Sequence, residues 1–343
     1  MEAGSTVLVT GGAGYIGCVL VPKLAKRYRV VILDACWFGK EALLSATAGL
    51  DNVTLIEGDI RDTPTVRGVL TEYRPSAVIH LAAVSNDPCS EIDPELTRSI
   101  NLEATSEVMR LANEHGVRRF LNASSASVYG IKETADVTED LSLEPLTLYA
   151  RYKTETEKVL GELIDETFCG ASVRAATVCG FSPRLRLDLT INILTYHALR
   201  RGAIRVFGGT QMRPNIHVQD LTDFYALLLE LPDEAIRGKA FNVVTSNATV
   251  MELAEMIRDN IDAQLPINVV PTEDTRSYHL SGAKARAELE FEPQRPLDLA
   301  IRELREAFDQ GTIADPDSIE HRNVEVMKQF PERTAVRRRS PSR

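Results

Sequence analysis

Residues 5–34 restrict the possible folds of this chain more than any other segment. A short apolar run at 7–9 leads into GGAGYIG, and apolar residues at helical spacing follow over 16–25. A second apolar run at 30–33 then ends at Asp34. Strand, glycine turn, helix, strand and terminal acid make one βαβ unit, whose two strands lie parallel in a sheet buried on both faces.

The glycines of GGAGYIG have the spacing of a turn that receives a dinucleotide. Gly11 permits a tight turn, Gly14 lets the backbone approach a pyrophosphate, and Gly17 lets the helix pack on the strand. The helix N-terminus attracts phosphates. Asp34 accepts from both hydroxyls of an adenosine ribose and repels a 2′-phosphate, which favours NAD over NADP. Glycine turns also occur in proteins that bind nothing, but here the strand, the helix and the acid are all present.

Net charge, length and hydropathy limit the kinds of partner and the overall organisation that the chain can have. The formal net charge is −10, which argues against a general nucleic-acid surface or an anionic membrane surface. A length of 343 residues exceeds one ordinary core and predicts two lobes. No apolar run reaches membrane-spanning length, and the N-terminus enters a strand directly, so we expect no membrane segment and no signal peptide.

The cysteines indicate the redox compartment. There are five, they contain no CxxC pair, and they form no ligand-like cluster with histidine. An odd, sparse set predicts reduced thiols in a cytoplasmic protein without a metal site.

Strand and helix patterns alternate through the first half of the chain, which predicts a parallel sheet with crossover helices on both faces. The third strand ends near Asp59, the next covers 77–83, and another over 120–123 leads into SSASVYG. Ligands of such sheets bind beyond the carboxyl ends of the strands. Asp59, the turn at Ala82 and Ser125 are therefore expected to meet at one crevice.

A second functional pattern lies in the helix expected within residues 145–163. Tyr149 and Lys153 are four residues apart and share one helix face, whereas Tyr152 faces elsewhere. A phenol with a pKa near 10 is a poor base at neutral pH, but a nearby ammonium stabilises the phenolate. A serine hydroxyl from a neighbouring strand end would hold the reacting oxygen. Taken alone, the pair is more typical of an ordinary helix surface than of a catalytic site.

These motifs occur in one order: GGAGYIG, Asp34, Asp59, HLAA, NLEAT, SSASVYG and YARYK. Together they resemble the extended short-chain dehydrogenase/reductase superfamily, in its nucleotide-sugar epimerase/dehydratase branch, over about residues 5–310. The resemblance implies a doubly wound parallel sheet of the Rossmann type with a smaller C-terminal α/β lobe. We expect an NAD-binding domain over 1–177, its sheet completed by part of 205–245. A lobe that binds the nucleotide sugar would follow over 178–312.

The resemblance also implies a role for each matching residue. The catalytic residues are Ser125, the acid/base Tyr149, and Lys153. Tyr149 and Lys153 are also expected to bind NAD, Lys153 through the nicotinamide ribose. The other residues expected to bind NAD are Gly11, Gly14, Tyr15, Ile16, Gly17, Asp34, Asp59, Ile60, Leu81, Ala82, Ala83, Asn101 and Val178. The residues expected to bind substrate are Ser85, Asn86, Ser125, Thr177, Val206, Phe207, Arg213 and Arg276.

Two departures from the family pattern narrow the reaction. The 4,6-dehydratases place Asp-Glu after the serine or threonine, where this chain has Ala126 and Ser127. Epimerases that work beside the keto group often place a cysteine at the position of Ser127. Hydride chemistry at one carbinol remains, most simply a 4-epimerase with a transient 4-keto intermediate. The alternatives are an NAD(H)-dependent nucleotide-sugar dehydrogenase or 4-ketoreductase and, more remotely, a non-catalytic dinucleotide sensor.

The expected partners are a UDP-, dTDP- or GDP-linked sugar and a second copy of this chain. Family members pair through helices that match 94–115 and 149–168, which implies a homodimer. Residues 313–343 form an extension, expected to be partly disordered, in which a helix within 317–330 would pack on the partner subunit.

Overall fold

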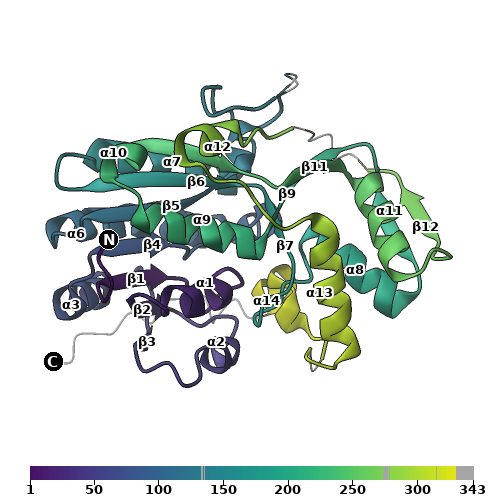
Figure 1. The fold of residues 1–343 in the computed structure, drawn as a ribbon, viewed down its shortest axis with the longest axis horizontal. Coiled ribbons are helices and arrows are strands. Elements are labelled where there is room, and N and C mark those ends of the chain that lie inside the picture. The colour runs from purple at the N-terminus through teal and green to yellow at the C-terminus, as the bar shows by residue number, and fades with distance from the viewer. Residues whose placement is uncertain (133, 135, 273–276, 278, 314, 330–343) are drawn as a thin grey trace.

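The computed structural model describes residues 1–329 apart from 133, 135, 273–276, 278 and 314. A seven-stranded parallel sheet forms its centre, with strand order β10-β6-β5-β4-β1-β2-β3 (Figure 1). The chain starts in the middle, winds outward through β2 and β3, then returns to β4 and winds the other way, so the fold is of the doubly wound Rossmann type. The strands are β1 (Thr6–Thr10), β2 (Arg29–Asp34), β3 (Val53–Glu57), β4 (Ala77–His80), β5 (Arg119–Ser125), β6 (Cys169–Ala175) and β10 (Lys239–Val243).

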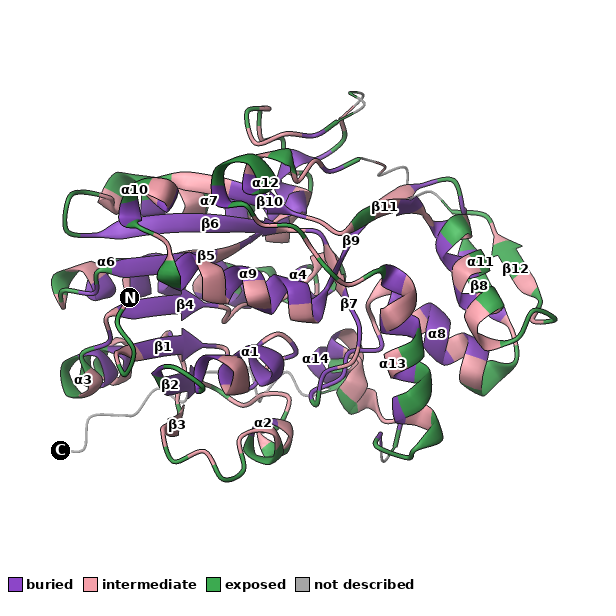
Figure 2. Ribbon diagram, in the orientation of Figure 1, coloured by how far each residue is buried: buried purple, intermediate pink, exposed green. Residues whose placement is uncertain are grey.

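Helices cover both faces of the sheet, and its central strands are almost wholly buried, whereas the edge strand β3 is only partly buried (Figure 2). On β1, Val7 and Val9 belong to the core under α1 and α9, whereas Leu8 belongs to the core under the helices of the other face. Successive residues of a strand point to opposite faces, so the continuous apolar run of β1 serves both cores. The helices concerned are α1 (Gly17–Leu24) and α9 (Val218–Glu230) on one face, and α3 (Thr63–Tyr73), α6 (Thr105–Glu114) and α7 (Leu148–Leu163) on the other.

A smaller α/β lobe lies beyond the carboxyl ends of the strands. Its core forms between three helices and the parallel pair β8–β12. Its elements are α8 (Thr190–Arg201), β8 (Ile204–Phe207), α11 (Val250–Ile261), β12 (Ile267–Val270) and α13 (Leu297–Asp309). A three-stranded sheet links it to the large sheet through β7 (Thr177–Cys179), β9 (Met212–His217) and β11 (Ser246–Thr249). Shorter segments are α2 (Glu41–Ala46), α4 (Asp87–Ser90), η2 (Ala126–Tyr129), α10 (Asp233–Ile236), α12 (Ala283–Leu289) and η3 (Ile319–His321).

The helix expected over 94–115 is divided by one π-helical segment. It runs as α5 (Pro94–Arg98), η1 (Ser99–Ala104) and α6. The Thr105 hydroxyl donates to the Ile100 carbonyl at 3.0 Å, five residues back, and accepts from buried His80 Nε2 at 3.0 Å. A side-chain hydroxyl and a buried imidazole therefore stabilise the wide turn that local propensity does not encode.

The C-terminal segment packs on its own chain, and the expected contact of its helix with a partner subunit stays a prediction. Helix α14 (Asn323–Gln329) lies against α4 and buries Val326 and Met327. Met327 joins the same core as Cys89 and Ile100. Apolar burial within the chain explains this placement. The remainder of the extension, residues 330–343, lies outside the described residues.

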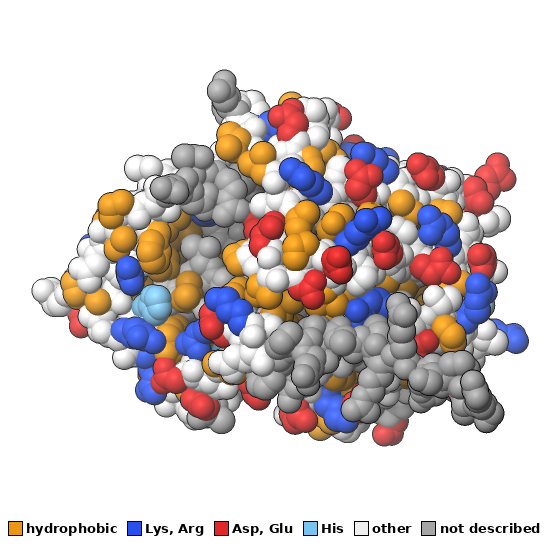
Figure 3. Space-filling model, turned by 180° about the vertical axis from the view of Figure 1, so that it is seen from behind, with side chains coloured by type: hydrophobic (Ala, Val, Ile, Leu, Met, Phe, Trp, Pro, Cys, Tyr) orange, Lys and Arg blue, Asp and Glu red, His pale blue; other side chains and the backbone are white. Residues whose placement is uncertain are grey.

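Acidic and basic side chains are interspersed on the face shown in Figure 3. In the described part of the chain, no helix has the length and apolarity that crossing a membrane requires. The same residues contain no group of histidine, cysteine and carboxylate side chains suited to a metal ion. All five cysteines are unpaired.

Candidate active site

Two cavities adjoin at the carboxyl ends of the strands. The first follows the glycine turn and the end of β2, and the second lies over the ends of β5 and β7 beside α7. Because several residues line both, the cavities form one continuous crevice at the topological switch point between β1 and β4. The shared residues are Ile16, Leu81, Ala83, Ser85, Val178, Arg186 and Leu189.

The glycine turn leaves its backbone bare toward the first cavity. Gly11 has φ +74°, and a Cβ there would lie 2.5 Å from the backbone nitrogen of Ala82. A Cβ on Gly17 would lie 2.3 Å from the carbonyl oxygen of Gly12, so only glycine lets α1 approach the turn this closely. A Cβ on Gly14 would have one atom within 4 Å, the carbonyl oxygen of Gly11 at 3.2 Å, and Gly14 lines the cavity. This is the cradle that a diphosphate needs.

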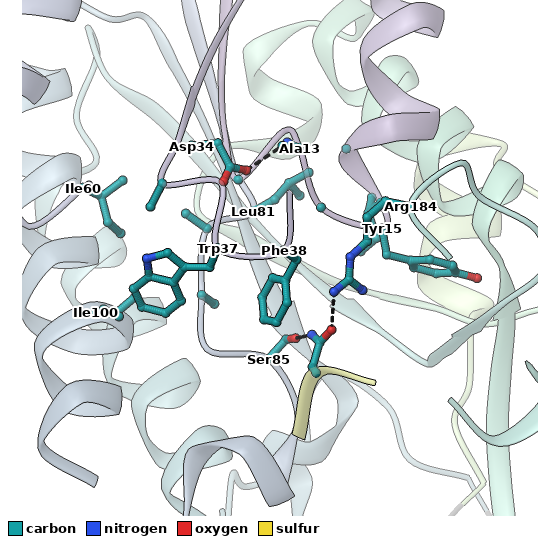
Figure 4. Close-up of a pocket in the computed structure, with 18 of the residues that line it drawn as sticks. Ala13, Tyr15, Asp34, Trp37, Phe38, Ile60, Leu81, Ser85, Ile100 and Arg184 are labelled. Carbon is teal, nitrogen blue, oxygen red and sulfur yellow. Dashed lines mark hydrogen bonds between the residues drawn. The ribbon is translucent and has the colours of Figure 1, made fainter. Parts of the chain in front are cut away.

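Asp34 lies at the end of β2 with its carboxylate held by the backbone. Its Oδ2 accepts from Ala13 N–H at 2.9 Å and its Oδ1 from Cys36 N–H at 2.7 Å (Figure 4). Burial raises the pKa of Asp34, and these two N–H groups together with the Arg184 charge oppose that rise. The carboxylate faces the first cavity, where it can accept ribose hydroxyls.

The far end of the first cavity has the character of an adenine site. Trp37, Ile60 and Ile100 line it with Asp59. Asp59 pairs with Arg61 at 2.7 Å, and the Arg61 guanidinium lies 5.8 Å from the Trp37 ring centroid. Apolar and aromatic walls of this kind receive a planar base.

Tyr15 connects two of the segments that line the crevice. Its side chain is buried, and its hydroxyl donates to the Gly180 carbonyl at 2.6 Å. This bond ties the glycine turn to the segment after β7. Ile16 and Val178 then line both cavities at their junction.

The three residues expected to be catalytic line the second cavity together. Ser125 ends β5 and caps η2, where its Oγ accepts from Ser127 N–H at 3.2 Å and from the Ser127 hydroxyl at 3.0 Å. Since Ser125 Oγ accepts twice from Ser127, its own proton is available for a ligand oxygen.

Tyr149 and Lys153 lie one turn apart on α7, and Lys153 Nζ is 5.7 Å from the Tyr149 ring centroid. Lys153 is buried, and burial lowers its pKa to about 8 while the Glu157 charge opposes the shift. Glu157 is in turn fixed by a bidentate pair with buried Arg174, with distances of 2.7 and 3.1 Å. A lysine with this pKa is still charged at neutral pH and favours a phenolate beside it.

The outer part of the second cavity holds a polar cluster. Arg186 forms a double hydrogen bond with Asp188 and donates to Ser85 Oγ at 3.2 Å. Asn86 Nδ2 reaches Asp188 Oδ2 at 3.3 Å. Thr177 and Arg213 also line this cavity. The cluster joins the expected substrate residues to two charged residues, 186 and 188, that motif reasoning did not single out.

Among the described residues, three that were expected to bind ligand do not line either cavity. Asn101 is buried, and its side chain forms two hydrogen bonds with the backbone of Val84. It accepts from the Val84 N–H and donates to the Val84 carbonyl, both at 2.8 Å. Val206 lies in the core of the small lobe, and Phe207 is half exposed beside Arg205. Arg276 lies outside the described residues.

Several cavity residues carried no motif. Trp37 and Phe38 follow Asp34 in a stretch that has no periodicity, and the only signal was an aromatic pair just beyond a strand-end acid. Arg184 and Arg186 lie in the loop before α8, Tyr225 on α9 and Asn323 on α14. Their positions depend on how distant segments fold together, which no local spacing records.

The comparisons with known proteins agree with this geometry. The NAD dependent epimerase/dehydratase family matches residues 7–243. This chain belongs to that family. UDP-glucose 4-epimerase of Rhizobium leguminosarum bv. trifolii is 30% identical over 88% of this chain and 96% of its own length. The Bacillus subtilis UDP-glucose 4-epimerase is 28% identical over 85% of this chain and 93% of its own.

A solved structure shows the same fold. The Thermotoga maritima UDP-glucose 4-epimerase with UDP-glucose superimposes with a TM-score of 0.81 at 26% identity, over 90% of this chain and 99% of that one. NAD is the cofactor of the family, and the first cavity fits it. The glycine cradle suits the diphosphate, Asp34 suits the adenosine ribose, and the aromatic end suits the base.

Proposed function

We propose that this chain is an NAD-dependent nucleotide-sugar 4-epimerase. The observation that carries this proposal is that Ser125, Tyr149 and Lys153 line one cavity that shares a wall with the dinucleotide cavity. An acid/base beside the cofactor site is what oxidation and reduction at a carbinol require. The epimerase relatives from two bacteria, which match along most of their length, support the same conclusion.

The chain's own residues handle the proton. The Tyr149 phenolate, which the Lys153 ammonium stabilises, takes the proton of the sugar 4-hydroxyl, and Ser125 donates to the sugar oxygen. Bound NAD⁺ supplies the hydride acceptor at carbon 4 and the hydride donor on return. The 4-keto sugar turns over in the cavity, and Tyr149 then gives its proton back to the inverted hydroxyl. The cofactor ends as it began.

Dehydration is disfavoured at this site. Ser125 is followed by Ala126 and Ser127, and the Ser127 hydroxyl is engaged with Ser125 Oγ. This pair offers no carboxylic acid to remove water across carbons 5 and 6 of the sugar. We therefore assign a reaction at a single carbon.

A UDP-linked sugar is the substrate we propose. The relatives named above are UDP-glucose 4-epimerases, and the solved structure contains UDP-glucose. In this chain Arg213 and Thr177 line the second cavity beyond the catalytic trio, where the diphosphate of the substrate would lie.

The direct test incubates the purified protein with UDP-glucose or UDP-galactose and follows both product formation and absorbance near 340 nm. The expected result is interconversion of the two sugars without net NADH formation. Steady accumulation or consumption of NADH that keeps pace with turnover would instead identify a dehydrogenase or a 4-ketoreductase. Matched dTDP- and GDP-sugars show whether the nucleotide is selected.

We also propose a cytoplasmic homodimer. Five unpaired cysteines support a reducing compartment. Leu102, Tyr152 and Val159 are partly exposed on η1 and α7, the helical elements that match the family's paired helices. Light scattering should give twice the chain mass of 37.9 kDa. A monomer mass at micromolar concentration would reject the dimer.

A further inference from the structure

Arg184 is a buried cation that lines the dinucleotide cavity. It lies in the loop between β7 and α8, and its side chain extends past Phe38 toward Ser85 (Figure 4). The residue is 5% exposed, and its guanidinium carbon is 4.5 Å from the centroid of the Phe38 ring. Its Nη2 donates to Asn323 Oδ1 at 2.6 Å.

Within the described part of the chain, Arg184 has no carboxylate in direct contact, although the charges of Asp34 and Asp188 act on it from a greater distance. Among the residues that the structure describes, no carboxylate forms an ion pair with it, whereas its neighbour Arg186 is paired with Asp188 at 2.9 Å. Burial, with the nearby Arg186 charge, lowers the pKa of Arg184 to about 10. A buried cation without a directly paired carboxylate is costly unless a ligand supplies the anion.

The cavity indicates which anion. Gly14 and Tyr15 of the glycine turn line the same cavity as Arg184, and the diphosphate is the anionic part of NAD. A planar guanidinium fork matches phosphate oxygens in both charge and hydrogen-bond geometry. Arg184 and the glycine turn therefore line one cavity, in which the diphosphate of NAD would lie.

Asn323 holds this arginine from the C-terminal end of the chain. It is the first residue of α14 and is 4% exposed. Its Oδ1 accepts from Arg184, and its Nδ2 donates to Ser85 Oγ at 3.2 Å. Both ends of the amide are used, and the burial of Val326 and Met327 anchors the helix that carries it.

We propose that Arg184 binds the cofactor diphosphate, and that Asn323 positions Arg184, so that the C-terminal segment becomes part of the NAD site and slows release of the cofactor. Asn323 lies beyond residues 7–243, where the family matches the chain. In this proposal, the C-terminal segment adds to the common fold a contact that retains the cofactor. An enzyme that recycles NAD in place benefits from slow release.

The test measures the rate of NADH release. The chain has one tryptophan, Trp37, and it lines the same cavity, so energy transfer from Trp37 reports bound NADH. Protein loaded with NADH is chased with excess NAD⁺, and loss of the signal is timed. Asn323→Ala should release NADH about tenfold faster, and Arg184→Gln about tenfold to a hundredfold faster, because each loses a charge-assisted contact. Gln329→Ala, exposed on the same helix, should release it at the wild-type rate.

The double variant, with both Arg184→Gln and Asn323→Ala, shows whether Asn323 acts by positioning Arg184 or only by packing. If Asn323 acts through Arg184, the double variant releases NADH no faster than Arg184→Gln alone, within about twofold. Independent, multiplying effects would reject the positioning role. If Asn323→Ala lowers the melting temperature but leaves the release rate unchanged, α14 is only a structural tie. Unchanged release in Arg184→Gln would overturn the assignment of the diphosphate contact.

Discussion

Lys153 and Tyr149 share one face of α7, with Lys153 Nζ 5.7 Å from the centroid of the Tyr149 ring. The ammonium is buried, so its field acts on the phenol through protein and not through bulk water. In the proposed mechanism, this one relationship makes Tyr149 usable as an acid/base at neutral pH.

Removing the phenol oxygen should abolish most of the activity. In Tyr149→Phe the turnover number is expected to fall about a thousandfold, because positioned acid/base catalysis contributes on that scale. NADH should still bind, since the residues that line the first cavity are unaltered. Tyr152→Phe, three positions along the same helix, is the matched control and should retain full turnover. Substantial turnover in Tyr149→Phe would point to another base.

The pH profile should report Lys153. Its pKa of about 8 means that the ammonium loses its proton as the pH rises through 8, so wild-type turnover should decline on the alkaline side from there. In Lys153→Met the weak residual turnover should instead rise with pH toward 10, the ordinary pKa of tyrosine. Arg151→Gln, on the exposed face of α7, should leave the wild-type profile unchanged. Parallel profiles in wild type and Lys153→Met would contradict the role of the ammonium.

Gly11→Ala should impair both folding and NAD binding, because its Cβ would lie 2.5 Å from Ala82 N. Gly49→Ala is a matched control: Gly49 has a similar φ of +80° but no atom within 4 Å of the added Cβ. The control should lose about 1 kcal/mol of unfolding free energy from backbone strain alone, and Gly11→Ala clearly more. Denaturant melts and NAD titration measure both. Equal losses in the two variants would show that close approach to Ala82 is unimportant.

His80 should make the protein sensitive to acid. It is fully buried, donates from Nε2 to Thr105 Oγ1, and accepts at Nδ1 from the Thr10 hydroxyl at 2.8 Å. Burial lowers its pKa from 6.5 to about 3. Between these two pH values His80 is therefore protonated in the unfolded chain and neutral in the folded chain. Stability from this residue is complete above pH 6.5 and is lost as the pH falls toward 3.

Denaturant melts at pH 6.5, 5.5 and 4.5 measure this contribution. The loss in the wild type should exceed that in His80→Gln by up to about 1.4 kcal/mol per pH unit. The variant keeps an amide that can bond both threonines, and it carries no titrating ring. Identical slopes in the two proteins would mean that His80 is protonated in the folded state.

The sequence predicted the fold because its signals are local. The apolar run of β1, the glycine spacing and the acid at the end of β2 lie within thirty residues of one another. The pair Tyr149 and Lys153 depends only on helical periodicity. The approach of Ser125 to that pair followed from a general rule, that the carboxyl ends of parallel strands face one crevice.

The π-helical segment was not predictable, because it depends on contacts from outside the helix. The sequence between 94 and 115 reads as one continuous helix. Only when β4 brings His80 against Thr105 does the wider turn at Ile100 gain its partners. That turn then places Ile100 at the cavity and Asn101 on the backbone of Val84.

By itself the sequence determined the βαβ unit, the choice of NAD and the placement of Tyr149 and Lys153 on one helix face, since each is encoded by residues a few positions apart or by strand order. Tertiary structure alone decided that Arg184 meets Asn323, 139 residues further along, and that α14 covers its own chain. The sequences of loops and terminal segments show no hydrophobic periodicity, so their positions depend on the distant surfaces against which they pack. Such contacts exist only after the two lobes have packed.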